Sequence, residues 1–266
     1  MSRVAVVTGA ARGIGAATVR GLAAAGWSVV AVDRGSDDPR LPYAMGSAEE
    51  LEATVSAAAA GSPEGGRVVA HVADTTDAEA LGAAVARAED RFGGLDAMVA
   101  VAGVIAGGVP LWEMPAAELR AVLVVDLEGP ITAARVGIPA LLRRPAPRQG
   151  RFLAVASAAA TRGLPMLAAY GAAKAGVAGL IRGLGAELAD TGVTANAISP
   201  GSTDTAMLGQ SARLYGIPDR HAFAHQQPVQ RLLTAEEVAA ALVWLAGPDS
   251  SALTGSVIPV DGGLSL

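Results

Sequence analysis

Short apolar runs alternate along the chain with longer segments that have the spacing of amphipathic helices. The first two runs, RVAVVT at 3–8 and SVVAVD at 28–33, are rich in valine and almost uniformly apolar. Runs of this kind are typical of strands buried on both faces, as in parallel sheets. We expect further strands in the segments 67–72, 95–102, 152–156, 193–198 and 256–260.

Capping and terminating residues indicate where the intervening helices begin and end. Ser47-Ala-Glu-Glu50 is a capping box, in which the Ser and Glu side chains each satisfy a backbone N–H group. Thr76-Asp-Ala-Glu79 and Thr234-Ala-Glu-Glu237 open two later helices. We expect helices from about 14 to Gly26, 47 to 60, 76 to Gly93, from near Pro115 through a bend at Pro130, 170 to 189, and onward from 234.

The order of these elements predicts the fold class. Repeated strand–helix units of this length require parallel strands joined by right-handed crossovers. No linker, internal repeat or shift in composition divides the 266 residues. We therefore expect one α/β domain over 1–266, a doubly wound Rossmann-type parallel sheet of about seven strands with helices on both faces.

The composition excludes several classes of protein. The chain is 52% hydrophobic and 17% charged, which favours a folded core over intrinsic disorder. Its net charge of −5 argues against a nucleic-acid surface, and the absence of cysteine excludes disulfides and thiolate metal sites. The sequence shows neither a signal-peptide pattern nor a membrane-spanning apolar stretch. We expect a cytoplasmic protein without a metal, a nucleic-acid partner or a membrane attachment.

A glycine-rich loop, Thr8-Gly-Ala-Ala-Arg-Gly-Ile-Gly15, joins the first expected strand to the first helix. Glycines at 9, 13 and 15 suit a tight turn, close approach of the backbone to a pyrophosphate, and close packing of helix on strand. The N–H groups and the positive dipole end near Ile14 favour an anion. The loop therefore predicts a nucleotide phosphate site rather than a merely structural turn.

An acidic residue closes the second expected strand. Asp33 lies where a carboxylate can hydrogen-bond both ribose hydroxyls and repel a 2′-phosphate, which favours NAD over NADP. Arg34 and Arg12 are the counter-evidence, because either guanidinium could pair with such a phosphate. Asp74, after the third strand, could meet the adenine edge or accompany Thr76 at a helix start, and both interpretations remain open.

The candidate catalytic residues surround the single lysine of the chain, which otherwise uses arginine among its 20 basic residues. Lys174 lies four residues after Tyr170 on an expected helix, so the two side chains share one face. A phenol with a pKa near 10 exchanges protons poorly at neutral pH unless a cation stabilises its anion. Ser157, at the end of the fifth strand, can hold a substrate oxygen beside Tyr170. Together the three suit proton transfer coupled to hydride transfer at a carbonyl or alcohol carbon.

Several of these motifs occur together in one known family. TGAARGIG, Asp33, Ser157, Tyr170-Gly-Ala-Ala-Lys174, Pro200-Gly201 with Thr205, and Asp261-Gly-Gly resemble the short-chain dehydrogenase/reductase family over nearly the whole chain. The resemblance implies a catalytic triad of Ser157, Tyr170 and Lys174, an alcohol or ketone substrate, NAD, and a homotetramer. It also implies a nicotinamide contact at 198–205 and a substrate lid over about 205–232. The expected cofactor-binding residues are Thr8, Gly9, Arg12, Gly13, Ile14, Gly15, Asp33, Arg34, Asp74, Gly103, Tyr170, Lys174, Pro200, Gly201, Thr203 and Thr205.

Two positions depart from the family pattern. The segment after the fourth strand reads Ala100-Val-Ala-Gly103, where family members usually carry Asn-Asn-Ala-Gly. Asp126 stands where they usually place an asparagine that supports a proton relay through water and the lysine. Asp126 could accept hydrogen bonds from Lys174 or water, although its charge would change the coupled titration. It completes the set of candidate catalytic residues.

The long connection at about 34–66 resembles that of the mycofactocin-associated branch of the family. Members of that branch are thought to hold NAD so firmly that a separate redox carrier, mycofactocin, must recycle it. An insertion beside the adenosine pocket could cover the dinucleotide and slow its escape, or could be a tolerated surface loop.

The residues favour an NAD-dependent oxidoreductase that interconverts a secondary or primary alcohol and its carbonyl compound. One alternative is an ordinary dehydrogenase of the family with freely exchanging NAD(P)(H), and another is a non-catalytic NAD-binding regulator. The chain has few aromatic residues, so we expect a dry pocket walled largely by aliphatic side chains such as Val104, Ile105, Leu164 and Met207.

Overall fold

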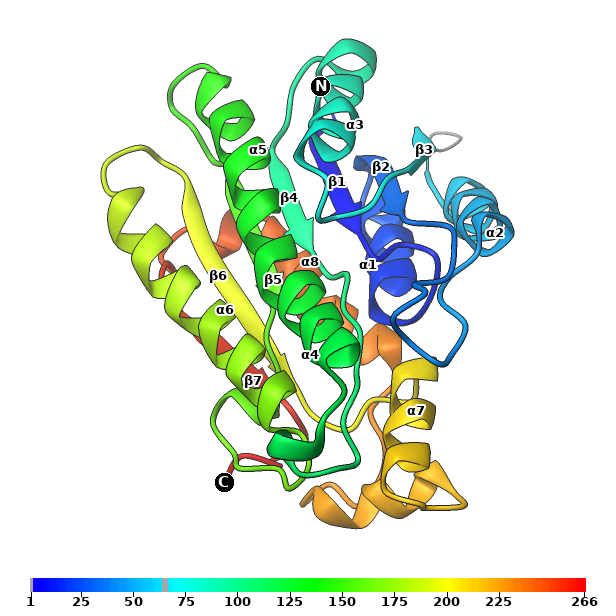
Figure 1. The fold of residues 1–266 in the computed structure, drawn as a ribbon. Helices are drawn as coiled ribbons and strands as arrows, with labels where there is room; N and C mark the ends of the chain where they lie inside the picture. Colours follow the sequence, from blue (N-terminus) through cyan, green and yellow to red (C-terminus); the bar gives the residue numbers. More distant parts are fainter. Residues whose placement is uncertain (1, 64–66) are drawn as a thin grey trace.

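Seven parallel strands form one sheet in the computed structural model, which describes residues 2–63 and 67–266 (Figure 1). The strands are β1 (Val4–Thr8), β2 (Ser28–Asp33), β3 (Val68–Val72), β4 (Ala97–Ala100), β5 (Arg151–Val155), β6 (Thr194–Pro200) and β7 (Val257–Val260). They follow the order β3-β2-β1-β4-β5-β6-β7 across the sheet, which confirms the expected doubly wound α/β fold. Met1 and residues 64–66 of the expected insertion lie outside the described residues.

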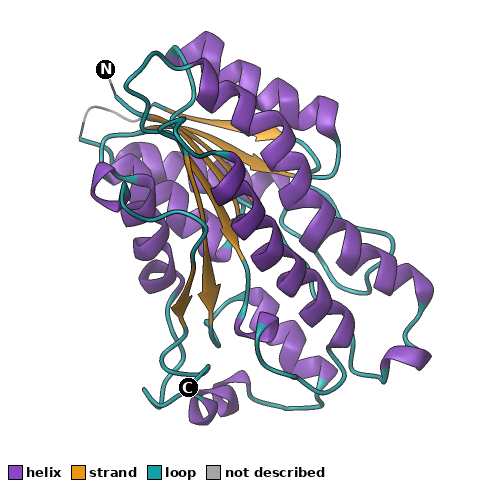
Figure 2. Cartoon of the chain, turned by 90° about the vertical axis from the view of Figure 1, so that its left-hand side faces the viewer, coloured by secondary structure: helices purple, strands orange, loops and turns teal. Residues whose placement is uncertain are grey.

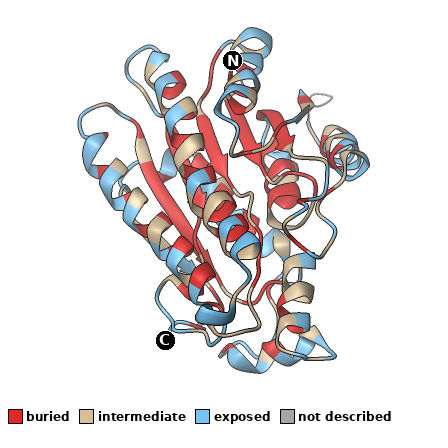
Figure 3. Ribbon diagram, in the orientation of Figure 1, coloured by how far each residue is buried: buried red, intermediate tan, exposed pale blue. Residues whose placement is uncertain are grey.

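Helices cover both faces of this sheet (Figure 2). Successive side chains of a strand point to opposite faces, so Val4 and Val6 pack in one core while Ala5 and Val7 pack in the other. Figure 3 shows the central strands buried along most of their length, as expected for a sheet covered on both faces, whereas the edge strands β3 and β7 are largely of intermediate exposure. One face carries α3 (Ala78–Phe92), α5 (Gly129–Arg143) and α6 (Ala168–Glu187), and the other carries α1 (Gly13–Ala24), α2 (Ala48–Ala60) and α8 (Ala235–Ala246).

The strand order creates a crevice at the carboxyl edge of the sheet. Strands β2 and β3 lie on one side of β1, and β4 to β7 lie on the other. The loops that follow β1 and β4 therefore diverge, and ligands bind at such a point in doubly wound folds. Helix α7 (Ala206–Leu214) lies beyond this edge, toward the bottom of Figure 1. A bridge between Thr203 and Leu233 joins the two ends of the segment that contains α7.

Two expected helix boundaries are wrong for identifiable reasons. Asp77 rather than Thr76 caps α3, because its carboxylate accepts hydrogen bonds from the N–H groups of Glu79 and Ala80 at 2.9 and 3.1 Å. The bend expected at Pro130 is instead a widened, π-helical turn (Val124–Glu128) between α4 (Ala116–Leu123) and α5. Pro130 lies at the second position of α5 and lacks the N–H that a tighter ladder needs.

Other local predictions agree with the structure more closely. The capping boxes at Ser47 and Thr234 are confirmed, each with both reciprocal hydrogen bonds. Most remaining ends of helices and strands shift by a few residues; β6, for example, extends to Pro200. Among the helices in 2–63 and 67–266, none combines the length and apolarity needed to cross a bilayer. The same residues contain no group of three or more His, Asp or Glu arranged to share a metal ion.

Candidate active site

A cavity of about 450 Å³ opens at the carboxyl edge of the sheet. The loops after β1 to β6 line it, together with α6 and the segment that contains α7. Asp126 lies outside this lining, behind Lys174. The other candidate residues all line the cavity: Thr8, Gly9, Arg12, Gly13, Ile14, Gly15, Asp33, Arg34, Asp74, Gly103, Ser157, Tyr170, Lys174, Pro200, Gly201, Thr203 and Thr205.

The glycine loop forms a cradle that side chains would fill. Gly9 has a φ of +66°, and a Cβ there would lie 2.7 Å from the backbone of Ala102. A Cβ on Gly15 would lie 1.9 Å from the carbonyl oxygen of Gly9, so only glycine lets α1 pack this close to the loop. Arg12 precedes α1 without capping it by its side chain, which leaves the N-terminal amides available to an anion. This cradle fits the pyrophosphate of a dinucleotide.

Asp33 lies at the end of β2, next to that loop. Its carboxylate accepts hydrogen bonds from the N–H groups of Ala11 at 3.0 Å and Gly35 at 3.3 Å. Each carboxylate oxygen can accept more than one hydrogen bond, so capacity for ribose hydroxyls remains. A Cβ on Gly46 would lie 3.3 Å from one oxygen of Asp33 and 2.7 Å from the Ala11 side chain, so residue 46 packs directly on this corner.

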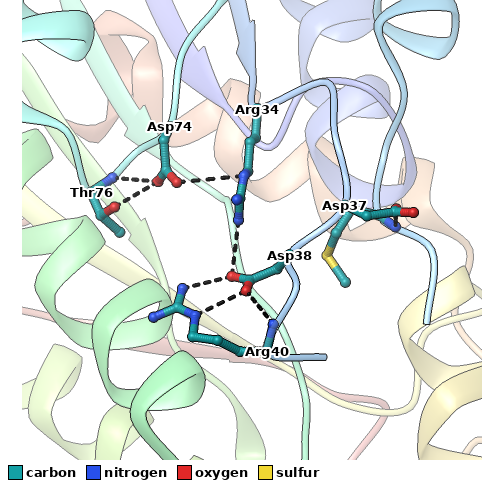
Figure 4. A network of polar contacts seen from close by, with 7 residues as sticks. Arg34, Asp37, Asp38, Arg40, Asp74 and Thr76 are labelled. Carbon is teal, nitrogen blue, oxygen red and sulfur yellow. Dashed lines mark hydrogen bonds and ion pairs between the residues drawn. The ribbon is translucent and has the colours of Figure 1, made fainter. Parts of the chain in front are cut away.

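The Arg34 guanidinium is engaged in an ion-pair network, which competes with binding of a phosphate (Figure 4). Its guanidinium lies 2.9 Å from Asp38 and 3.6 Å from Asp74. Asp38 is 2% exposed and also binds Arg40 through two side-chain hydrogen bonds of 2.6 and 2.9 Å. These bonds to Arg40 hold the pKa of Asp38 well below its usual range. Arg34 thus already has two carboxylate partners, which favours NAD over a cofactor with a 2′-phosphate.

Asp74 combines features of both interpretations left open by the sequence. One oxygen accepts hydrogen bonds from the N–H and the hydroxyl of Thr76, at 2.9 and 2.7 Å. The other oxygen faces Arg34, and the residue lines the cavity. Asp74 therefore orders the start of the α3 region and anchors Arg34 from the neighbouring loop.

The Tyr170–Lys174 pair lies at the opposite end of the cavity. Both side chains come from α6 and are buried, and the Lys174 ammonium lies 5.6 Å from the centre of the Tyr170 ring. Ser157 follows β5 and begins a short 3₁₀ turn, where its hydroxyl accepts a hydrogen bond from Ala159 N–H at 3.1 Å. Helix α6 and strand β5 thus aim a phenol, an ammonium and a hydroxyl at one region of the cavity.

The charges around Tyr170 oppose one another. Burial, the largest effect, and the charge of Asp126 raise the pKa of Tyr170. Lys174 and a hydrogen bond with Ser157 lower it, but the net effect is an increase. Burial alone would lower the pKa of Lys174, but Asp126 and Tyr170 outweigh this effect and raise it, so the ammonium stays charged. A permanent cation beside the phenol is the condition that proton exchange at Tyr170 needs.

Asp126 lies in the π-helical turn, fully buried beneath the pair. Its Oδ1 is 3.0 Å from Lys174 Nζ and accepts a hydrogen bond from Val104 N–H at 3.3 Å. Its Oδ2 is buried without a hydrogen-bond partner in the described structure. Burial raises the pKa of this carboxyl group, against the opposing effect of Lys174. Gly103 permits this approach, because a Cβ there would lie 2.7 Å from Oδ1.

Residues 34–47, which we call the strap, add cavity-lining side chains that the sequence analysis missed. The hydroxyl oxygen of Tyr43 accepts a hydrogen bond from Ile105 N–H at 2.8 Å, and the carbonyl of Ala44 accepts one from Arg12 at 2.9 Å. Asp38 and Met45 also line the cavity. The available signal was the alternation of Leu41, Tyr43 and Met45, which join the apolar cluster around Tyr170.

A doubly wound fold with a pyrophosphate cradle and a buried Tyr–Lys pair at one cavity defines a dinucleotide-dependent oxidoreductase. Comparison with known proteins agrees. A family model described as "Enoyl-(Acyl carrier protein) reductase" matches residues 9–265. The chain belongs to the short-chain dehydrogenase/reductase family, and it is an NAD-dependent enzyme that interconverts alcohols and carbonyl compounds.

Individual relatives and structures cover almost the whole chain. The cis-4-hydroxycyclohexanecarboxylate dehydrogenase of Sinomonas cyclohexanicum is 38% identical over 98% of this chain and 96% of its own length. The (-)-trans-carveol dehydrogenase of Rhodococcus erythropolis is 33% identical over 99% and 98%. The structure of carveol dehydrogenase from Mycobacterium avium in complex with NAD has a TM-score of 0.92 at 29% identity, covering 98% of this chain and 97% of that chain.

Proposed function

We propose that the enzyme interconverts a cyclic secondary alcohol and its ketone, with Ser157, Tyr170 and Lys174 as the catalytic residues. The supporting observation is the buried Tyr170–Lys174 pair, which shares one cavity with the pyrophosphate cradle. Relatives named for hydroxycyclohexanecarboxylate and carveol act on cyclic secondary alcohols, which favours this substrate class.

The proton chemistry follows from the positions of these groups. Bound NAD⁺ would supply the hydride acceptor that conversion of the alcohol to the ketone requires. Ser157 and Tyr170 would hold the substrate oxygen, and the Tyr170 phenolate would take the hydroxyl proton. Lys174 stabilises that phenolate, and the proton then leaves Tyr170 for solvent.

Asp126 acts in this proposal as a positioning residue for Lys174. Its Oδ1 and the Val155 carbonyl, 3.0 and 3.2 Å from Nζ, fix the ammonium from below. A carboxylate there also neutralises the local positive charge, which leaves less net positive charge to lower the pKa of Tyr170. We therefore expect the phenol to titrate higher than it would beside an uncompensated lysine.

The remaining candidates would hold the cofactor. The loop from Thr8 to Gly15 would bind the pyrophosphate, Asp33 the adenosine ribose, and Lys174 the nicotinamide ribose. Arg12, Arg34 and Asp74 would border the adenosine end, mainly by fixing the strap. Gly103 and the segment holding Pro200, Gly201, Thr203 and Thr205 would border the nicotinamide, with 205–232 as the substrate lid.

The strap supports a finer proposal, that NAD remains bound between turnovers. Contacts from Tyr43 to Ile105, from Ala44 to Arg12 and from Arg34 to Asp74 tie it to three different loops around the cavity. Release of a dinucleotide covered by the strap would require several of these contacts to break together. A separate redox carrier would then reoxidise the bound NADH, and the sequence resemblance makes mycofactocin our candidate.

The retention of NAD can be measured directly on the purified enzyme. Extensive dialysis followed by denaturation should release close to one NAD per chain, and an artificial dye should support alcohol oxidation better than added NAD⁺. A Tyr43→Ala variant should lose NAD during the same dialysis. An empty wild-type protein that turns over with free NAD⁺ would establish the ordinary, exchanging form of the enzyme instead.

The catalytic assignment has its own test. Tyr170→Phe should lower turnover by about 10²–10⁴-fold, because the proton acceptor is lost, while bound NAD is unchanged. Tyr215→Phe is the matched control, since it removes a hydroxyl from the same cavity that bonds to the Pro165 carbonyl at 2.7 Å. Equal losses in the two variants would contradict the assignment and favour a non-catalytic, NAD-binding role.

Assembly and location remain part of the proposal. Homotetramer formation is expected from the family resemblance, and exposed apolar side chains such as Trp112, which is 85% exposed, are compatible with an interface. Analytical ultracentrifugation would distinguish tetramers from smaller species. We place the enzyme in the cytoplasm on the sequence pattern alone.

A further inference from the structure

The end of the cavity beyond Ser157 and Tyr170 has an apolar wall. Leu164 and Leu167 come from the connection between β5 and α6, and Met207 comes from α7. Tyr215 and Phe223, from the segment after α7, meet edge to face with ring centres 6.3 Å apart. Val104, Ile105 and Ile217 continue this wall. A molecule held here would therefore have one polar end, at Ser157 and Tyr170, and an apolar body.

The polar atoms of these wall segments are largely used in holding the segments together. Gly108 N–H donates to the Met166 carbonyl at 3.1 Å, which joins the loop after β4 to the loop after β5. The Tyr215 hydroxyl donates to the Pro165 carbonyl at 2.7 Å, and the Ser211 hydroxyl to the Met207 carbonyl at 3.2 Å. Three separate segments thus close the wall with their own hydrogen bonds and present mostly carbon to the cavity.

The cations of the cavity are committed elsewhere. Among its described lining residues these are Arg12, Arg34 and Lys174. The two arginines lie at the Asp33 end, where Arg12 donates to Ala44 and Arg34 pairs with Asp38 and Asp74. Lys174 pairs with Asp126. A substrate carboxylate placed against the apolar wall would lose water without gaining a charged partner, which is strongly unfavourable.

We infer that the substrate is a neutral, apolar secondary alcohol or ketone, and that hydroxy acids are excluded by the lack of a charge partner at this wall. This inference rests on the proposed function and narrows its substrate class. It also separates the enzyme from its 38% identical relative, whose name specifies a carboxylate substrate.

A pair of probes that differ in charge but not in ring or hydroxyl tests the inference. The probes are cis-4-hydroxycyclohexanecarboxylate and its methyl ester, each oxidised with both NAD⁺ and a dye as acceptors. We expect kcat/KM for the ester to exceed that for the acid by about 100-fold, as burial of an unpaired charge implies. A preference of less than tenfold for the ester, or any preference for the acid, would overturn the inference while leaving the alcohol dehydrogenase assignment intact.

Binding gives a second readout that does not depend on turnover. Calorimetry on NAD-loaded Tyr170→Phe protein should detect the ester and its ketone but not the acid at equal concentrations. If wild type oxidises neither probe, the proposed function is in question, and this titration still decides the charge preference of the cavity. Tighter binding of the acid would contradict the inference.

A charge introduced into the wall provides the converse experiment. Ile217→Lys should lower the ratio of kcat/KM for the ester to kcat/KM for the acid by at least tenfold, because the lysine supplies a positively charged partner for the carboxylate. Ile217→Met is the matched control, since it lengthens the side chain without a charge and should keep the neutral preference. Equal ratios in the two variants, with both folded by circular dichroism, would show that charge pairing does not set the preference.

Discussion

Asp38 and Asp126 are both buried carboxylates beside the same cavity, and they differ in how their charge is compensated. Asp38 lies in the strap between Arg34 and Arg40 and also accepts a backbone hydrogen bond from Arg40. Asp126 lies in the π-helical turn with one ammonium and one backbone N–H, and its second oxygen has no hydrogen-bond partner among the described residues. The pKa of Asp38 is lowered by its hydrogen bonds to Arg40, whereas burial raises the pKa of Asp126.

This difference separates a structural ion pair from one coupled to chemistry. Two arginines lower the pKa of Asp38, so this carboxylate fixes the strap in its ionised form at neutral pH. Asp126 pairs with Lys174, which also lies beside Tyr170, and a change in one of the three groups alters the pKa of the others. Carboxylates with similar burial thus serve different purposes because the number and type of their partners differ.

The largest expected effect comes from removing Lys174, the ammonium that lies beside Tyr170 and Asp126. Lys174→Met leaves Asp126 buried without a charge partner and should lower the free energy of unfolding by about 3–5 kcal/mol, measured by urea denaturation. Lys174→Met/Asp126→Asn should regain much of this loss, since the unpaired charge is gone. Arg40→Met should cost less, because Asp38 keeps Arg34. A double variant no more stable than the single one would refute the account of Asp126.

At the strap, Asp38→Asn should lower the free energy of unfolding by about 1.5–3 kcal/mol at neutral pH, the value of hydrogen bonds to a charged group. Because the folded pKa of Asp38 is depressed, its contribution is complete above the unfolded pKa near 4 and is lost as pH falls toward the folded value. The stability gap between wild type and variant should therefore close in acid. A gap that stays constant from pH 7 to pH 3 would show that the charge is not responsible.

Asp126→Asn should change the pH dependence of kcat/KM more than it changes the amount of NAD bound. Removing the carboxylate leaves Lys174 uncompensated, which lowers the pKa of Tyr170. Since oxidation requires the phenolate, the acid limb of kcat/KM should move to lower pH by about one unit. Asp38→Asn is the control at the other end of the cavity and should leave this limb in place. An unshifted Asp126→Asn profile would separate Asp126 from the titration of Tyr170.

The smallest effect concerns a single neutral hydrogen bond of the strap. Tyr43→Phe removes the acceptor for Ile105 N–H, at a cost of about 0.5–1.5 kcal/mol. The rate of NAD dissociation should become about two- to tenfold faster. This rate can be monitored by diluting the NAD-loaded protein into an excess of an enzyme that consumes NAD. Tyr215→Phe should not alter this rate, because its hydroxyl bonds outside the strap. Identical rates in wild type and Tyr43→Phe would argue that this contact does not limit release.

The fold could be predicted from the sequence because its signals are local and repeated. Valine-rich runs identify β1 and β2, and capping boxes place the starts of α2 and α8 within a residue. The proposed Tyr170–Lys174 pair could be predicted equally well from the sequence, because the two residues lie one helical turn apart and a helix fixes their relative positions. The glycine spacing of the loop from Thr8 to Gly15 likewise allowed the proposed pyrophosphate cradle to be predicted.

The strap and the π-helical turn could not be predicted in the same way. Asp38 occurs in a polar stretch without a distinctive motif, and its burial depends on the conformation of the strap, in which Arg34 pairs with Asp74 and Met45 N–H donates to Asp37. Asp77 and Thr76 are both good capping residues, and the hydrogen bonds from Thr76 to Asp74 decide between them. The widened turn at Asp126 likewise depends on packing against Lys174 from another helix. Each of these features is set by partners distant in sequence or by competition among neighbours.

The hydrogen bond between Tyr43 and Ile105 joins two compartments that are usually considered separately. Ile105 belongs to the proposed substrate wall, and Tyr43 belongs to the strap that we propose to cover the dinucleotide. Where two ligands are coupled through such a contact, each changes the affinity for the other by the same factor. We therefore expect an alcohol that orders Ile105 to raise the affinity for the dinucleotide, and the dinucleotide to raise the affinity for the alcohol to the same extent.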